Sequence, residues 1–295
     1  MTPYSAIASN KRRSALFIAL FVILVLAVGW AWDHLEGGGT AVVPIAGVVG
    51  VGSALTGYFA GDKIALAANR AIAVQKEETP ELHRLIENLA ITAGLPMPKV
   101  YVIPSKAINA FATGRDPRHA SIAVTEGALE QLDRSELEGI LAHELSHVQN
   151  YDIRLMMIVA VFVGTIALLG DWFFRSRLWG MHGRNRDRSG APAALALAGL
   201  VLLILSPLIA QLIQFAISRR RELLADASGV LLTRYPEGLT NALRKIQAAH
   251  EPVATANSAT AHLYFANPLS GRRLATFFST HPPLEDRIKA LETMG

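Results

Sequence analysis

The chain has 295 residues, of which 51% are hydrophobic and only 18% charged, and its mean hydropathy is +0.31. This composition is too apolar and too weakly charged for an ordinary soluble or disordered protein. The 28 Lys and Arg residues barely exceed the 24 Asp and Glu residues, so we expect no nucleic-acid partner. The absence of cysteine excludes disulfides, thiolate nucleophiles and cysteine-held metals, which leaves histidine and carboxylate as possible metal ligands.

The N-terminal region, residues 1–61, is predicted to form a transmembrane hairpin. Its first apolar stretch, residues 14–32, follows the basic Lys11-Arg12-Arg13. A signal peptide is the alternative, but this core is longer than a typical signal core and no small-residue cleavage site follows it. The second stretch, residues 40–60, is rich in Gly and Ala, which permit close helix packing in lipid. We therefore expect a retained hairpin with its N-terminus in the cytosol and a lipid bilayer as a partner.

Residues 62–152 are predicted to be the first part of a cytosolic catalytic domain. Thr79-Pro80-Glu81 is typical of a helix start, with Thr79 as N-cap, and Gly94 is typical of a helix stop. Three β-like runs follow, at residues 100–103, 110–113 and 121–125. Asp133 and Glu136 then have the spacing of a capping box. The predicted fold class is α+β, mainly helical, with a small sheet in a zincin-like domain.

The helix after Asp133 carries the motif with the clearest chemistry, His143-Glu144-Leu145-Ser146-His147. Histidines four residues apart lie on one face of a helix, so both imidazoles can bind one Zn²⁺. Glu144 lies at the edge of that face, where it can act as general base on a metal-bound water. A structural His/Glu cluster is the alternative interpretation.

Residues 153–217 are predicted to form a second apolar hairpin. Its first stretch, residues 155–170, is short for a membrane span, and its second, residues 191–217, is interrupted by Pro207. The arginine-rich loop at residues 175–190 would lie outside the cell if both stretches cross, against the positive-inside rule. The pair either crosses, dips into the membrane or packs on the domain as core helices.

Residues 218–295 are predicted to be the second part of the catalytic domain. A catalytic zinc needs a third protein ligand, and the best candidate is Glu222, with Asp226 one helical turn later. Asp226 is placed to accept a hydrogen bond from a zinc-binding imidazole, most simply that of His143. The alternative is that Glu222 only forms ion pairs with the arginines that precede it. Rival third ligands are Glu126, Glu138, His182, His250 and His281.

Both ligand segments lie close to apolar stretches. His147 is eight residues before Leu155, and Glu222 is five residues after Ile217, or roughly 8–12 Å along a helix. The site is therefore expected near the membrane surface, on the cytosolic side where the basic N-terminus lies.

The chain resembles the HtpX family of bacterial membrane zinc proteases, and more distantly the type I CAAX prenyl proteases. The resemblance covers essentially the whole length and rests on an ordered set of motifs. These are two N-terminal apolar segments, residues 109–114, residues 141–152 with the H-E-x-x-H, a second apolar pair, Arg221-Glu222 with Asp226, and residues 279–283 leading to Arg287.

The resemblance implies a multi-pass endopeptidase of the bacterial inner membrane, with its catalytic domain in the cytosol. Its substrates would be unfolded, misfolded or damaged membrane proteins, within envelope quality control and the stress response. His143, His147 and Glu222 match the ligands of one Zn²⁺ per chain, and Glu144 matches the general base.

Two weaker elements complete the predicted site. Asn109, Ala110, Phe111 and Ala112 are expected on an exposed edge strand that binds substrate as an added strand, although an ordinary sheet edge is the alternative. His281 and Arg287 are predicted to stabilise the oxyanion as catalytic residues, although His281 also fits a plain helix start.

Other function classes remain beside the endopeptidase. The main alternative is a non-proteolytic membrane chaperone or scaffold that retains a zinc site, and the intact Glu144 argues against it. A transporter or pore is disfavoured because the apolar stretches carry few ionisable residues. A prenyl-protein protease is disfavoured because the apolar segments are too few to enclose a large intramembrane chamber.

Overall fold

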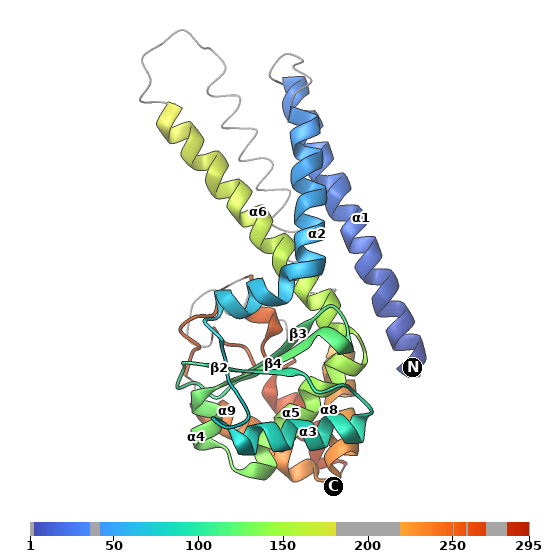
Figure 1. Cartoon of the computed structure of the whole chain (residues 1–295), viewed down its shortest axis with the longest axis vertical. Coiled ribbons are helices and arrows are strands. Elements are labelled where there is room, and N and C mark those ends of the chain that lie inside the picture. The colour runs from blue at the N-terminus through green and yellow to red at the C-terminus, as the bar shows by residue number, and fades with distance from the viewer. Residues whose placement is uncertain are drawn as a thin grey trace.

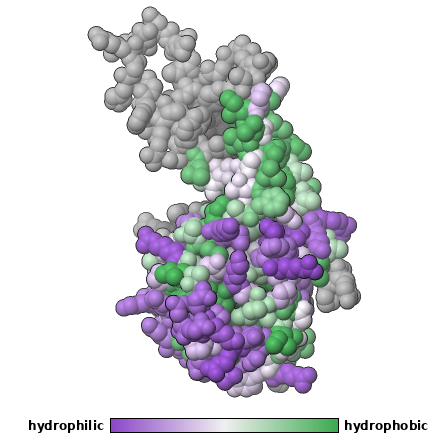
Figure 2. All heavy atoms as spheres, in the orientation of Figure 1, coloured by the Kyte–Doolittle hydropathy of each residue, from purple (hydrophilic) through white to green (hydrophobic). Residues whose placement is uncertain are grey.

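A computed structural model describes residues 3–35, 42–180, 219–249, 251–257, 259–269 and 282–294 (Figure 1). Two long helices, α1 (Pro3–Leu35) and α2 (Val42–Ala68), pack side by side and rise from one end of a mixed α/β domain. Their apolar parts, Ile7–Trp30 and Val43–Ala68, are each long enough to cross a bilayer. The surface of this hairpin is apolar, whereas much of the domain surface is polar (Figure 2).

The helix pair packs closely because α2 presents small residues to α1. A Cβ added at Gly50 would lie 3.4 Å from the Cβ of Val25, and one at Gly47 would lie 3.5 Å from Leu26. Small residues at such contacts let helix backbones approach in lipid. These contacts fix the antiparallel register of the two helices.

Helix α6 (Asp152–Gly180) connects the domain to the hairpin. It begins three residues before the predicted apolar stretch and continues ten residues beyond it, because residues 171–180 contain no proline to stop the helix. Its first half is buried against α1 and α2, where the ring of Phe162 stacks on that of Phe21. The predicted stretch at residues 191–217 lies outside the described residues.

The sheet has the order β1-β2-β4-β3, with β2 and β4 parallel and the other pairs antiparallel. The predicted runs correspond to β2 (Lys99–Ile103), β3 (Ala110–Gly114) and β4 (Ala120–Thr125), while the two-residue β1 (Ile72–Ala73) was not foreseen. Successive side chains of β3 enter different cores: Phe111 packs on the side of the hairpin and α6, and Ala112 packs on the opposite side. The sheet therefore lies between the membrane hairpin and the helices that cover its other face (Figure 1).

Two helices below the sheet begin where the sequence predicted. Helix α3 (Pro80–Ala93) ends at the left-handed Gly94, and α5 (Arg134–Gln149) begins with the capping box of Asp133 and Glu136. Thr79 is the N-cap of α3 as predicted, although its hydroxyl makes no capping hydrogen bond and contacts His83 instead. The remaining described helices are η1 (Pro117–His119), α4 (Glu126–Gln131), α8 (Arg219–Thr233), α9 (Pro236–Ala249), η2 (Ala261–Leu263) and α10 (Leu284–Glu292).

Helices α8 and α9 both pack on α5 through glycines, which joins the two parts of the chain expected to form the catalytic domain. A Cβ at Gly229 of α8 would lie 3.1 Å from the amide nitrogen of His143. A Cβ at Gly139 of α5 would lie 2.8 Å from the amide nitrogen of Leu239 in α9. The close approach of α8 brings Glu222 and Asp226 to the motif on α5.

Candidate metal centre

Three side chains from α5 and α8 converge at one buried point. The Nε2 atoms of His143 and His147 are 3.1 Å apart. Carboxylate oxygens of Glu222 lie 3.7 Å from the first of these nitrogens and 3.6 Å from the second. Within the described part of the chain these three residues form the group able to hold a metal ion.

The donor set fits Zn²⁺. Tetrahedral zinc with bonds of about 2.0–2.1 Å to nitrogen and oxygen requires donors roughly 3.3 Å apart. The separations of 3.1–3.7 Å at this site match that requirement. Three protein ligands also leave a fourth position for water or substrate, as catalytic zinc sites do.

His143 is oriented by Asp226. Its Nδ1 donates to a carboxylate oxygen of Asp226 at 2.8 Å, which directs Nε2 toward the other ligands. Two nitrogens of Arg287 from α10 bind the same carboxylate at 2.6 and 2.9 Å, and a third donates to the carbonyl of Phe265 at 3.0 Å. The Phe265 ring packs edge-on against the imidazole of His143 and under the Arg287 guanidinium. This support is contained within the catalytic domain.

His147 is oriented by a second carboxylate, Asp152, at the start of α6. The distance from His147 Nδ1 to Asp152 Oδ2 is 3.1 Å. The other oxygen of Asp152 accepts from Arg221 of α8 at 3.1 Å and from the side-chain amide of Asn10 at 2.7 Å. Asn10 belongs to α1 and also donates to the carbonyl of Asn150. The membrane helix α1 is therefore joined to the metal site by two hydrogen-bonded steps.

Glu144 points at the edge strand of the sheet. Its Oε2 accepts a hydrogen bond from the backbone N–H of Ala112 at 2.8 Å. Burial, with a smaller contribution from the charge of Glu222, raises the pKa of Glu144 to about 7. A carboxylate with a pKa near neutrality both accepts and returns protons at physiological pH, which suits a general base.

The ionisable groups of the site differ in the direction of their pKa shifts. Burial, reinforced by the charge of Arg287, lowers the pKa of His143 to about 4, so this imidazole is neutral and ready to bind a metal. For His147, the effect of burial is outweighed by Asp152 and the nearby glutamates, which raise its pKa to about 9. Burial acts against ionisation of Asp226, but Arg287 and His143 together lower its pKa to about 2.

The predicted substrate strand is an edge strand, but the expectation that it is exposed was wrong. Asn109, Ala110, Phe111 and Ala112 are at most 3% exposed. The carbonyl of Ala110 accepts from the N–H of Phe265 at 2.8 Å. The side chain of Asn109 donates to the carbonyl of Ala266 and accepts from its N–H. Residues 264–266 thus cover the start of this edge, which sequence patterns did not reveal because they come from a distant irregular segment.

The structure brings none of the other predicted ligands that it describes into the group of His143, His147 and Glu222. Glu126 is exposed and Glu138 is partly exposed, and neither belongs to the metal-binding group, while His182, His250 and His281 lie outside the described residues. Arg287 is fully buried and its donors face Asp226 and a carbonyl, so its geometry differs from that expected of an oxyanion donor. Sequence reasoning missed Asp152 and Asn10, and the only available signal was a carboxylate five residues after His147.

Comparisons with known proteins agree with this geometry. The sequence pattern of peptidase family M48 matches residues 76–295. A protease HtpX homolog of Caldanaerobacter subterraneus subsp. tengcongensis is 44% identical over 297 residues, covering 99% of this chain and 98% of the relative. One from Dictyoglomus thermophilum is 44% identical over 294 residues, covering 100% of this chain and 95% of the relative. The crystal structure of S. mikatae Ste24p superimposes with a TM-score of 0.53 at 21% identity, over 97% of this chain and 66% of that protein, and shows a shared fold.

Proposed function

Because the chain belongs to peptidase family M48, and is a membrane metalloprotease, we propose that it is a zinc endopeptidase acting on misfolded or damaged membrane proteins. The observation that carries the proposal is the convergence of His143, His147 and Glu222 beside a glutamate whose pKa is near neutral. Zinc held by His143, His147 and Glu222 would supply Lewis acidity that polarises the scissile carbonyl and lowers the pKa of a bound water.

In the proposed reaction, Glu144 moves the protons. Its carboxylate takes a proton from the attacking water and gives it to the nitrogen of the departing amine, so the peptide bond is hydrolysed without a covalent intermediate. The Ala112 N–H fixes one of its oxygens while the other is left to exchange protons. Asp226 and Asp152 hold the two imidazoles in the tautomer that presents Nε2.

The proposed substrate site is the edge of β3, where the chain's own residues 264–266 now lie. Asn109 binds both polar groups of Ala266, and the Ala110 carbonyl binds the N–H of Phe265. An extended substrate offers the same backbone groups, so it can replace this segment with little demand on its side chains. This exchange predicts a broad specificity and requires residues 264–266 to move before substrate enters.

The location follows from the charge and position of the hairpin. Lys11-Arg12-Arg13 lie near the N-terminal end of the first span, Ile7–Trp30, which favours a cytosolic N-terminus and therefore a cytosolic catalytic domain. The hydrogen bonds from Asn10 to Asp152 and from His147 to Asp152 keep the candidate metal site close to the N-terminal end of α1. We propose that the protein lies in the bacterial inner membrane, where such a site reaches substrates as they leave the bilayer.

A non-proteolytic chaperone or scaffold is the second candidate, and the burial of the site favours it. His143, Glu144, His147 and Glu222 are at most 4% exposed, so a peptide has no access in this conformation. A scaffold would need the zinc for its fold but would not need Glu144.

The experiment compares the purified full-length protein with its Glu144→Gln variant. Zinc per chain and cleavage of an unfolded protein are measured in the same samples. We expect about one zinc in both and a loss of cleavage of about 10²–10⁴-fold in the variant. Zinc in both proteins with cleavage in neither would support the scaffold instead.

A further inference from the structure

A cluster of cations and aromatic rings lies where the hairpin meets the domain. The ring of Tyr151, at the bend between α5 and α6, carries the Lys11 ammonium at 4.4 Å and the Arg154 guanidinium at 5.0 Å from its centroid. Arg154 also lies 5.6 Å from the ring centroid of Tyr58. These contacts hold two positive charges on one ring, since cations are attracted to aromatic faces.

A third cation extends the cluster. Arg115 follows β3, and its guanidinium lies 5.7 Å from the ring centroid of Phe59 in α2. Its backbone carbonyl accepts a hydrogen bond from Nε of Arg154, which ties the two residues together. The cluster is therefore assembled from α1, α2, the loop after β3 and the start of α6.

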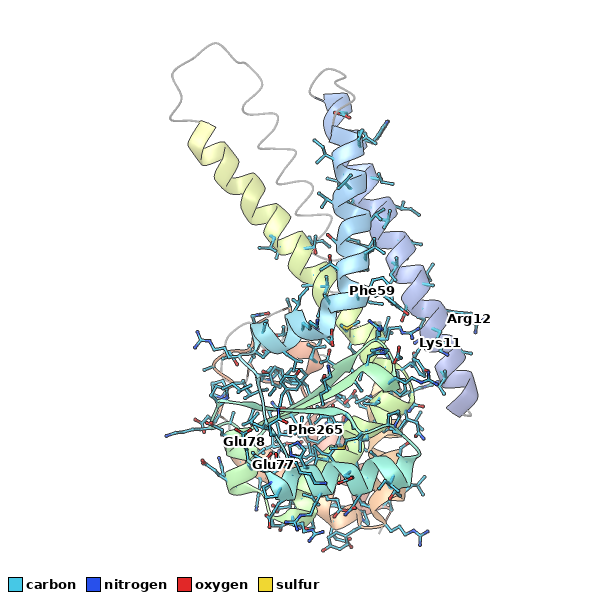
Figure 3. The ribbon with its side chains drawn as sticks, viewed as in Figure 1. Lys11, Arg12, Phe59, Glu77, Glu78 and Phe265 are labelled. Atoms are coloured by element: carbon cyan, nitrogen blue, oxygen red, sulfur yellow. The ribbon has the colours of Figure 1, made fainter. Side chains whose placement is uncertain are left out.

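The depth of this cluster matches the headgroup region of a bilayer. The contacts of Gly50 with Val25 and of Gly47 with Leu26 place Lys11 level with residues 62–64 of α2. Phe59 lies about one turn further along the hairpin, away from the domain, and 59% of it is exposed. Figure 3 shows Lys11 and Arg12 on α1 and Phe59 on α2 where the hairpin approaches the domain. Aromatic rings beside basic side chains are typical of the membrane–water interface.

The charges of Lys11 and Arg154 are not balanced by nearby acids. Among the described residues no carboxylate forms an ion pair with either of them, whereas Arg115 has Asp116 at 3.7 Å. Asp152, two residues from Arg154, is bound to Arg221 and Asn10. Two like charges held on one ring repel each other, and an anion bound near both of them offsets that repulsion.

We propose that Lys11 and Arg154, held in place by the Tyr151 ring, bind the phosphate of an anionic phospholipid. The depth of the site favours a lipid over a soluble phosphate. The selectivity follows from the ring: because Lys11 and Arg154 already cover Tyr151, a choline headgroup would add a third cation where two already repel. The proposal depends on the membrane hairpin and not on the peptidase reaction.

A lipid bound at this site would affect the candidate metal centre through the bend at Tyr151 between α5 and α6. Tyr151 has a left-handed backbone, with φ +60°, and joins the metal-binding α5 to α6 at an angle of 83°. It lies between Asn150 and Asp152, the two residues that Asn10 binds. A lipid held by Lys11 and Arg154 therefore stabilises the arrangement that presents Asp152 to His147.

The test measures binding of phosphatidylglycerol and phosphatidylcholine to the full-length Glu144→Gln chain in detergent, by native mass spectrometry. We expect phosphatidylglycerol to bind more tightly, and the Lys11→Gln/Arg154→Gln variant to lose about tenfold or more of that affinity. The matched control is Lys63→Gln/Arg70→Gln, which removes two exposed cations at the same end of the hairpin and retains binding.

Three results would overturn the proposal. The first is undiminished binding of phosphatidylglycerol to the Lys11→Gln/Arg154→Gln variant, and the second is an equal loss in the control. The third is displacement of the lipid by glycerol phosphate at equal concentration, which would identify a soluble phosphate as the ligand. A Lys11→Arg/Arg154→Lys variant separates charge from folding: it is expected to bind normally, and its failure would also contradict recognition by charge.

Discussion

The two histidines of the candidate metal site are supported in the same way by different parts of the molecule. Each donates from Nδ1 to a buried aspartate, and each aspartate is bound by an arginine. For His143, the aspartate and arginine come from α8 and α10 and are enclosed in the catalytic domain. For His147, the aspartate begins the helix that leads to the membrane and is also bound by Asn10 of the transmembrane α1.

This difference predicts that the two halves of the site respond differently to a movement of the membrane hairpin. The partners of His143 all lie in the domain. A shift of α1 would move Asn10 and with it the support of Asp152, so the His147 half is the one expected to respond. The support of His143 and the support of His147 can be told apart with variants that remove one supporting residue at a time.

The largest effect is expected at Arg287. Its replacement in Arg287→Met leaves Asp226 buried without its cation, which destabilises the fold by about 3–5 kcal/mol and weakens metal binding. Denaturant unfolding of the metal-free protein measures the change. Arg244→Met is the control, since Arg244 pairs with Glu292 at an exposed position and its loss costs below about 1 kcal/mol. Equal effects in the two variants would contradict the role of Arg287 in positioning Asp226.

The aspartates themselves come next. Asp226→Asn and Asp152→Asn each remove the acceptor charge behind one imidazole, and we expect each to lower zinc affinity about 10–100-fold. Competition with a chelator of known affinity measures this. Asp116→Asn is a suitable control, because this aspartate pairs with His119 away from the metal site. Unchanged affinity in Asp152→Asn would show that His147 needs no such partner.

A smaller effect is expected from the membrane anchor. Asn10→Ala removes the hydrogen bonds to Asp152 and Asn150, and we expect zinc affinity to fall about fivefold, as for the loss of about 1 kcal/mol. In a double-mutant cycle, Asn10→Ala should couple with Asp152→Asn and not with Asp226→Asn. Ser14→Ala, one turn further along α1 and also buried, serves as the control. Additive effects of Asn10→Ala and Asp152→Asn would remove the proposed link.

The smallest effect concerns the segment over the edge strand. The hydroxyl of Tyr264 donates to Asn69 at the end of α2 and helps to hold residues 264–266 in place. Tyr264→Phe loosens this segment, and we expect kcat/KM on an unfolded protein to rise about two- to fivefold. Tyr101→Phe, on β2, is the control. A lower kcat/KM in Tyr264→Phe would indicate that the segment assists the substrate instead of competing with it.

Local patterns predicted much of the architecture and the metal group. The apolar runs of the hairpin, the Asp133–Glu136 capping box and the i, i+4 spacing of His143 and His147 depend on residues near one another in sequence, so sequence alone predicts them. Glu222 was singled out because zinc chemistry requires a third ligand, and the structure brings it next to His143 and His147; its role as a ligand stays a prediction.

The parts that sequence did not predict depend on long-range packing. Asn10 and Asp152 are separated by 142 residues, and their hydrogen bond exists only because α1 packs on the bend at Tyr151. Burial of Ala110 requires Phe265, which is also remote in sequence. Arg287 was assigned to the oxyanion because its positive charge was known, whereas its partners depend on where α10 packs.

The most direct measurement is X-ray absorption at the zinc edge on the full-length Glu144→Gln protein. The account predicts two imidazole nitrogens and one or two light oxygen ligands at about 2.0–2.1 Å, with one imidazole lost in His143→Ala and in His147→Ala. A spectrum with three or more imidazoles, or one unchanged by these substitutions, would contradict a site formed by His143, His147 and Glu222.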